Sequence, residues 1–197
     1  MRWAVGKIRV ADEFRGSRES VRARNVVGRH LQPKDETMAE FSRITPCLWF
    51  DTRAEEAAEF YVGVFENSRV LETTYFGPGG MRPADMVLTV EFELDGQAFT
   101  ALNGGPEFTF DEAVSFQIAC ADQKEVDYYW ERLTEGGQES QCGWLKDRFG
   151  VSWQVVPAEV MEMTRDTDPE RRRRTTEALL KMGRIDIDTL RRAAQGS

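Results

Sequence analysis

Residues 85–103, DMVLTVEFELDGQAFTALN, contain two runs of alternating apolar and polar residues separated by Asp95 and Gly96. An Asp-Gly pair favours the tight primed turn of a two-residue β-hairpin, and this alternation is typical of strands with one buried face. The pairs expected across the turn are Phe92 with Phe99, Val90 with Ala101, and Glu91 with Thr100. The stretch therefore predicts an antiparallel hairpin with an apolar face and a polar face.

The residues before this hairpin predict a strand, a helix and a second strand. The first strand covers residues 44–50, ITPCLWF, the helix residues 51–65, and the second strand residues 68–76. Asp51 or Thr52 is expected to cap the helix, because either side chain can accept a hydrogen bond from its free amide groups. Apolar residues at helical spacing make the buried face of this helix: Ala57, Phe60, Tyr61 and Val64.

The same order of elements then begins again. Residues 114–120, VSFQIAC, predict a strand, and residues 124–137 predict a helix that its two final glycines stop. Residues 141–147 and 151–156 form a second predicted hairpin around residues 147–150. Strand, helix and hairpin thus occur twice at a spacing of about 70 residues, so internal duplication organises the chain.

The N-terminal residues differ from this pattern. Residues 1–37 are rich in Arg, Gly, Ser and Glu and show no sustained period, which predicts a loose extension. An Arg-rich mitochondrial presequence is the alternative, although Asp12, Glu13 and Glu19 count against it. A cleaner segment opens at Met38, and we expect that residue to be an alternative start of the protein.

The rest of the chain divides into a double domain and a tail. The domain is predicted at residues 38–160, with modules at about 44–105 and 113–157. Residues 161–197 predict a helical tail, in which Asp168 is the N-cap of a helix.

The charge pattern argues against nucleic acid as a partner. Residues 1–37 carry nine basic against five acidic residues, whereas the remainder carries 17 against 29, for a net charge of −8. Nucleic-acid affinity comes mainly from cationic contacts to phosphates, which an acidic body does not supply. The arginine run 171–174 is interpreted as a solvated helix face, with docking onto a partner subunit as the alternative.

Composition also bears on the compartment. No apolar run approaches the length of about 18 residues that a membrane span needs, and no membrane association is expected. The three cysteines, Cys47, Cys120 and Cys142, are widely separated and predict neither a disulfide framework nor a zinc ribbon. A cytoplasmic location is the simplest interpretation.

Four stretches carry a family resemblance. These are ITPCLWFDTRAEEAAEFY (44–61), FTALNGGPEFTF (99–110), AVSFQIAC (113–120) and CGWLKDRFGVSWQVVP (142–157). They resemble the vicinal oxygen chelate superfamily, which includes glyoxalase I, extradiol dioxygenases and bleomycin-resistance proteins. Within it they are most similar to the PhnB-like branch, often labelled 3-demethylubiquinone-9 3-methyltransferase. The resemblance implies an α+β fold in which two βαβββ modules form a cup-shaped mixed sheet of eight strands, commonly completed by homodimerisation, plus a helical tail.

Metal-dependent members of the superfamily hold their ion with His, Glu or Gln residues from the first and last strands of each module. Those positions correspond to Pro46, Ser115, Gln154 and, in the fourth strand, a residue among 100–103. Proline has no ligand atom, and a serine and a glutamine are poor ligands for a divalent ion. The one histidine, His30, lies in the N-terminal extension. We therefore expect no metal.

The methyltransferase label also lacks support in the residues. Methyl transfer from S-adenosylmethionine usually needs a glycine-rich turn between a strand and a helix, where backbone amides meet the cofactor. The two glycine-rich stretches, residues 77–81 and 103–107, follow hairpin strands and open no helix. No cofactor is expected.

Strand alternation assigns residues to the two faces of each sheet. Apolar residues are expected beneath the helices: Val90, Phe92, Ala101, Phe116, Ile118, Trp153 and Val155. Polar residues of opposite parity are expected in the cup: Thr89, Glu91, Thr100, Ser115, Gln117, Ser152 and Gln154. A polar cup suits a small organic ligand oriented by hydrogen bonds, and Thr100, Ser115, Gln117, Ser152 and Gln154 are the predicted ligand-binding residues. Gln117 and Gln154 fit a dimer interface equally well.

Two functions follow from this arrangement. In the first, the protein is a metal-independent binding module that holds a small organic molecule in the cup. In the second, it is a metal-free enzyme that uses Glu91 and Gln154 for acid/base chemistry. Glu91 could act as a general base if it were partly buried, whereas an exposed glutamate on a strand is the simpler interpretation.

Overall fold

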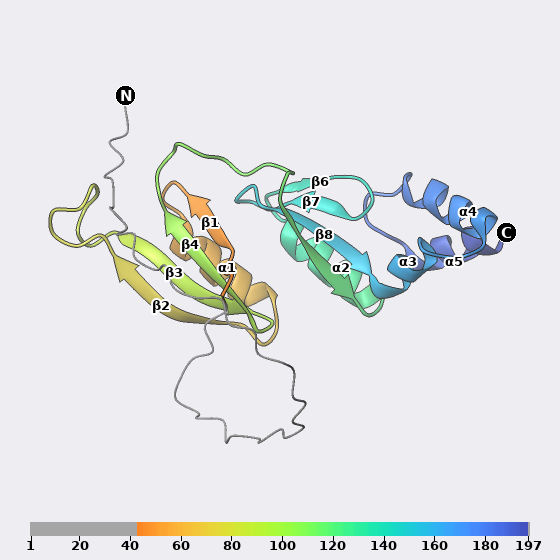
Figure 1. Cartoon of the computed structure of the whole chain (residues 1–197), viewed down its shortest axis with the longest axis horizontal. Helices are drawn as coiled ribbons and strands as arrows, with labels where there is room; N and C mark the ends of the chain where they lie inside the picture. Colours follow the sequence, from red (N-terminus) through yellow and green to blue (C-terminus); the bar gives the residue numbers. More distant parts are fainter. Residues whose placement is uncertain (1–42, 197) are drawn as a thin grey trace, which may run out of the picture. The chain divides into compact units, whose positions relative to one another are not determined.

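The computed structural model describes residues 43–196, and the predictions for residues 1–37 and for Met38 lie outside them. Strands and helices follow in the order predicted for two βαβββ modules (Figure 1). The first module contains β1 (Cys47–Phe50), α1 (Ala54–Val64), β2 (Arg69–Tyr75), β3 (Val87–Leu94) and β4 (Gln97–Asn103). The second module contains β5 (Ser115–Cys120), α2 (Gln123–Thr134), β6 (Gln138–Glu139), β7 (Trp144–Lys146) and β8 (Ser152–Pro157).

Each module forms its own four-stranded mixed sheet. The strand order is β1-β4-β3-β2 in the first sheet and β5-β8-β7-β6 in the second. The pairs β1–β4 and β5–β8 are parallel, and the other pairs are antiparallel. The predicted α+β class with two βαβββ modules is confirmed, and the eight strands are divided between two hydrogen-bonded sheets. Helix α1 packs on the first sheet and α2 on the second.

The hairpin of β3 and β4 has the predicted register. Val90 pairs with Ala101, Glu91 with Thr100, and Phe92 with Phe99. At the turn Asp95 and Gly96 both have positive φ, 46° and 79°, as the primed turn requires.

The first helix is capped by a residue that the sequence analysis did not select. The prediction of Asp51 or Thr52 is wrong, because the N-cap residue is Arg53 and its side chain makes no capping bond. Instead, the Ala54 amide donates to Oδ1 of Asn103 at 2.8 Å. Nδ2 of Asn103 donates to the Val87 carbonyl at 2.9 Å. This buried side chain joins α1 to the ends of β3 and β4.

The C-terminal helices follow directly from the second sheet. They are α3 (Ala158–Met163), α4 (Pro169–Leu179) and α5 (Ile187–Gln195). Asp168 caps α4 as predicted, by accepting from the Glu170 amide at 2.9 Å. Val160, Ile185 and Leu190 are buried together and hold these helices against one another. Within residues 43–196 no helix is both long and apolar enough to cross a bilayer.

The predicted helix-facing residues separate into two groups. Five are buried: Val90, Phe92, Ala101, Trp153 and Val155. Phe116 and Ile118 are only half-buried, because they lie on β5, an edge strand of the second sheet. Part of the apolar surface of β5 therefore stays open.

A buried aspartate joins the two modules. One carboxylate oxygen of Asp147 accepts from the Tyr61 hydroxyl of α1 and from Nε1 of Trp153, each at 2.8 Å. The other oxygen accepts from the amides of Phe149 and Val151 at 2.8 and 3.1 Å. Burial raises the pKa of Asp147, although the four hydrogen bonds oppose this shift. The carboxylate closes the β7–β8 turn and ties it to α1.

Candidate functional site

Two glutamine side chains meet on the polar face of the second sheet. Gln117 of β5 pairs with Gln154 of β8 in the parallel register. Nε2 of Gln154 donates to Oγ of Ser115 at 2.8 Å, which orients the amide along the sheet. Trp144 of β7 lies opposite Gln154, so its indole shares this face. The alternation of β5 and β8 thus brings together three of the predicted ligand-binding residues.

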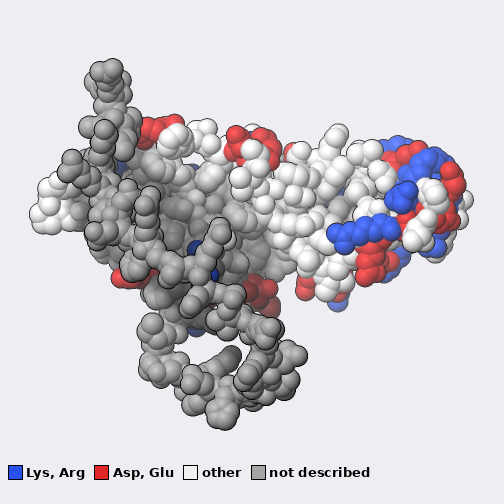
Figure 2. All heavy atoms as spheres, in the orientation of Figure 1, with Lys and Arg blue, Asp and Glu red and all other residues white. Residues whose placement is uncertain are grey.

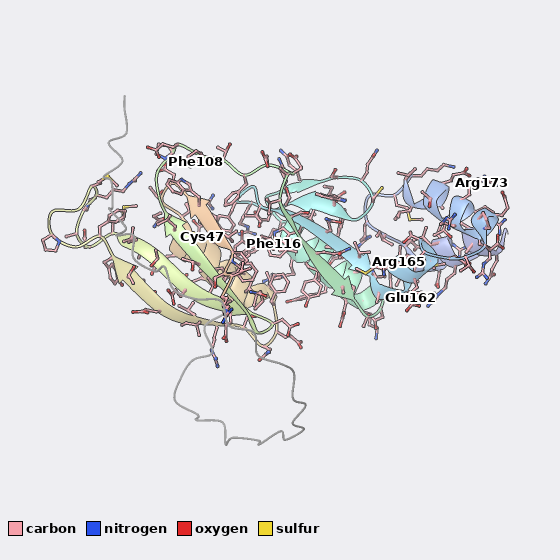
Figure 3. All side chains as sticks on the ribbon, in the orientation of Figure 1. Cys47, Phe108, Phe116, Glu162, Arg165 and Arg173 are labelled. Atoms are coloured by element: carbon pink, nitrogen blue, oxygen red, sulfur yellow. The ribbon has the colours of Figure 1, made fainter. Side chains whose placement is uncertain are left out.

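A cavity of about 310 Å³ opens over these glutamines. Its remaining walls come from the loop before β7 and from the C-terminal helices. The lining residues are Gln117, Cys142, Trp144, Gln154, Val156, Val160, Met161, Thr164, Arg165, Leu179 and Ile185. Figure 3 labels Arg165 just beyond the end of α3. The sheet supplies the amides of this cavity, and the tail supplies most of its apolar wall.

The cavity has a defined electrostatic character. Among residues 43–196, no carboxylate lines it, and Arg165 is its one cationic side chain. Gln117, Gln154 and Thr164 add neutral hydrogen-bonding groups to a mostly apolar lining. Such a composition matches sites in which a few polar groups orient a largely apolar ligand.

Sequence reasoning missed the part of the site contributed by the tail. Met161, Thr164 and Arg165 lie on or just after α3, which begins directly after β8. No helical pattern was recognised there, because α3 covers only six residues. Trp144 could have been selected, because the predicted second hairpin places its side chain beside Gln154.

The other predicted site residues lie elsewhere. Thr100 and Glu91 form a cross-strand pair on the first sheet and do not line the cavity. Glu91 is half-exposed. Ser152 is buried, and its hydroxyl donates to the Asp111 carbonyl at 3.3 Å. Ser152 nevertheless pairs with Ser115 in the β5–β8 register, so the four predicted residues of the second sheet share one face, and two of them, Gln117 and Gln154, line the cavity.

The family's metal positions do not fit a divalent ion in this chain. The carbonyl of Pro46 accepts from the Thr100 amide at 2.9 Å, as part of the sheet. The side chains of Ser115 and Gln154 are hydrogen-bonded to each other, and the side chain of Asn103 caps α1. Among residues 43–196, no group of three or more His, Cys, Asp or Glu side chains could hold a metal. The donors at these positions are neutral and already engaged, which is a poor match to Zn²⁺ or Fe²⁺.

The buried thiol is not suited to nucleophilic chemistry. Burial, with the nearby carboxylates of Glu125 and Asp122, raises the pKa of Cys120 to about 12. The thiolate is the reactive form of cysteine, and this shift keeps the group protonated at neutral pH.

The glycine-rich stretches have the surroundings that the sequence predicted. Residues 77–81 lie in the loop between β2 and β3, and residues 103–107 lead from β4 towards β5. Neither stretch opens a helix whose N-terminus could face a cofactor.

The arginine run 171–174 forms intramolecular contacts. Arg173 pairs with Glu170 and Glu177 at 2.9 and 2.8 Å, and Arg174 donates to the Ala193 and Ala194 carbonyls. In Figure 2 basic and acidic atoms alternate over the C-terminal helices. The run therefore belongs to a mixed charged surface.

Comparisons with known proteins found a matching family model and similar solved structures. The family model described as 3-demethylubiquinone-9 3-methyltransferase matches residues 42–156. A PhnB protein from Bacillus cereus is 30% identical, with a TM-score of 0.56, and the match covers 59% of this chain and 100% of that protein. A Pseudomonas aeruginosa protein is 22% identical, with a TM-score of 0.49 over 59% and 98% of the two chains. A glyoxalase/bleomycin resistance/dioxygenase domain from Frankia is 14% identical, with a TM-score of 0.40 over 59% and 92%. No curated protein matches the chain.

Proposed function

The chain belongs to the 3-demethylubiquinone-9 3-methyltransferase family, and we propose that it binds a small organic molecule on the polar face of its second sheet. The observation that carries this proposal is the convergence of Gln117 and Gln154 in one cavity. Their amides can donate to or accept from a ligand, and the tail helices cover the apolar remainder of that ligand.

The cavity suggests the class of ligand. A cationic molecule would meet Arg165 without a compensating carboxylate, whereas a neutral or anionic acceptor would be favoured there. The Trp144 indole offers a flat apolar surface for a ring. The ligand is therefore a neutral or anionic organic molecule with hydrogen-bond acceptors and an apolar part.

Binding is proposed to be independent of metal. The support is the donor set at the family's metal positions, where Pro46, Ser115 and Gln154 provide no imidazole or carboxylate. A saturating chelator is expected to leave ligand affinity unchanged. Loss of binding that a divalent metal restores would refute this part of the proposal.

A metal-free enzyme is the second candidate, and the family's description as an enzyme, though not its methyl-transfer chemistry, favours it. In this candidate Glu91 is the general base and Gln154 orients the substrate. Glu91 lies on the first sheet and Gln154 on the second, so the two would act together only if a second subunit joined the faces. A Glu91→Gln variant that keeps ligand affinity but loses turnover would support the enzyme, and unchanged turnover would remove Glu91 from it.

A homodimer and a cytoplasmic location complete the proposal. Homodimerisation follows from the family resemblance, and sedimentation that shows a monomer at micromolar concentration would refute it. The cysteines Cys47, Cys120 and Cys142 are all free in the structure, which suits a reducing compartment.

The test is a screen of neutral and anionic fragments by ligand-observed NMR against the full-length protein. We expect hits that compete with one another and that bind about fivefold more weakly to a Gln117→Ala or Gln154→Ala variant, since each change removes one hydrogen bond. Gln138→Ala is the matched control, because Gln138 is exposed and does not line the cavity. Hits that bind equally to all three variants would place the site elsewhere.

A further inference from the structure

A second and larger cavity lies between the two modules, on the side of the sheets that carries the helices. Its volume is about 670 Å³. It is lined by Phe65, Glu66, Leu94, Asp95, Gln97, Phe99, Phe116, Gln117, Ile118, Ala119, Ala121, Glu125, Tyr129 and Trp153. Figure 3 labels Phe116 in this region between the modules. Apart from Gln117, at the edge of the second sheet, this lining shares no residue with the cavity described above.

Five aromatic rings form a continuous wall of this cavity. Phe65 stacks on Tyr129 with 5.2 Å between ring centroids and lies 5.3 Å from Trp153. Phe116 lies 5.3 Å from Trp153 and 5.2 Å from Phe99. Phe99 and Trp153 are buried, whereas Phe65, Phe116 and Tyr129 are half-buried and offer ring surface to a ligand. The contacts hold the five rings in fixed positions, so this surface is preformed.

The rim of the cavity is acidic. It carries the carboxylates of Glu66, Asp95 and Glu125, and the described part of the chain contributes neither lysine nor arginine to the lining. Among the ion pairs of the described residues, none involves these three carboxylates. Glu125 accepts only from the Ala121 amide, at 2.7 Å. Within the described residues, no basic side chain therefore neutralises the negative charge of the rim.

The sequence also predicts that the cavity wall should be covered. Phe116 and Ile118 are expected beneath a helix, yet both remain half-buried at the edge strand β5. The buried face of α2 consists of Val126, Trp130 and Leu133, and none of these lines the cavity. Apolar area of this kind is costly to leave in water, which favours an occupant.

We propose that this cavity binds a small organic cation that carries an aromatic ring, such as an aryl or benzyl ammonium compound. Aromatic faces attract cations through their quadrupole, and this attraction strengthens as the cation is desolvated. The rim carboxylates attract the same charge at longer range. The aromatic part of the ligand stacks on the wall of rings, and the ammonium group lies towards Glu66 and Glu125.

The negative charge of the rim also affects the pKa of Tyr129, one of the lining residues. The pKa of Tyr129 is raised by burial and by Glu125, with smaller contributions that include Asp95. Burial, the larger cause, disfavours charge of either sign, whereas the contribution of the carboxylates disfavours a phenolate and favours a cation.

The experiment uses the full-length protein and three probes that share one ring: benzyltrimethylammonium, benzyl alcohol and benzenesulfonate. Isothermal titration near neutral pH is expected to detect the cation, with affinity at least about tenfold above that of the neutral and anionic probes. Added salt should weaken the cation's binding, because the rim is exposed. Equal affinity for all three probes, or no binding of the cation at millimolar concentration, would overturn the proposal.

Paired variants then locate the bound cation. The double variant Glu66→Gln, Glu125→Gln is expected to weaken binding of the cation about tenfold. Glutamine keeps the packing of each side chain and an oxygen that can accept from the Ala121 amide. The control is Glu131→Gln, on the same helix but outside the cavity. Unchanged affinity in the double variant, or an equal loss in the control, would contradict the assigned position.

The aromatic wall is tested separately. Tyr129→Ala removes a lining ring, whereas Tyr128→Ala removes the neighbouring ring that does not line the cavity. Loss of cation binding in Tyr129→Ala alone, with both variants folded by circular dichroism, supports the proposal. If both variants keep full affinity, the site is refuted.

Discussion

Asn103 connects three elements through one side chain. It lies at the end of β4, caps α1 through the Ala54 amide and holds the Val87 carbonyl of β3. The sequence did not reveal this role, because Ala54 is 49 positions away and the residue resembles an ordinary strand exit. A buried side chain that satisfies two backbone groups is costly to replace.

Asn103→Ala is expected to destabilise the fold by about 2–4 kcal/mol, since it leaves a buried amide and a buried carbonyl without partners. Urea denaturation measures this change in the free energy of unfolding. Gln97→Ala, at an exposed position of the same strand, should alter stability by less than about 0.5 kcal/mol. Similar values for the two variants would show that Asn103 does not support α1.

We expect the stability of the fold to depend on pH through Asp147. Burial raises its pKa in the folded state. A raised carboxyl pKa means that the folded state binds the proton more tightly, so this stabilisation is present below the unfolded pKa. It is lost as the pH rises through the folded pKa, from about pH 4 upward.

The Asp147→Asn variant isolates that dependence. An asparagine has an NH₂ group in place of one carboxylate oxygen, and this group cannot accept the hydrogen bond from the Trp153 indole. We therefore expect the free energy of unfolding to fall by about 1–3 kcal/mol. The difference from the native protein should be largest in acid and shrink as the pH rises above about 4. Urea denaturation between mild acid and neutral pH measures it, and a difference that grows with pH would contradict the raised pKa.

At the scale of elements, local sequence predicts the β3–β4 hairpin well. Asp95 and Gly96 favour one turn type, and that turn fixes the register of both strands. The short elements β6 and α3 were not predicted, because two and six residues carry too little periodicity. Strand alternation was enough to predict the amide side chains of the candidate site. Thr164 and Arg165 could not be predicted in this way, because their position depends on how the C-terminal helices pack against the second sheet.

Two glycine substitutions test the hairpin and the helix together. Gly96 has φ of 79°, so Gly96→Ala should destabilise the protein by about 1 kcal/mol even though a Cβ meets nothing there. Gly63 lies within α1 in open space, so Gly63→Ala should stabilise it by about 0.5–1 kcal/mol. Thermal unfolding measures both, and shifts of the same sign would contradict the assigned conformations.

At the scale of the whole molecule, duplication predicts the two modules, but it does not predict how they are joined. The contact between Tyr61 and Asp147 crosses 86 positions and follows from no local pattern. The division of the strands into two sheets likewise leaves Glu91 and Gln154 on different surfaces. Residues that strand alternation places on the polar faces of the two modules therefore need not belong to one site.

Native mass spectrometry of the protein as purified, before and after dialysis against a chelator, tests the central claim most directly. We predict a bound small organic molecule that survives chelation, is absent from the Gln117→Ala, Gln154→Ala double variant and remains in Gln138→Ala. No stoichiometric metal should accompany it. A molecule that chelation releases, or that the double variant retains, would contradict metal-independent binding on the second sheet.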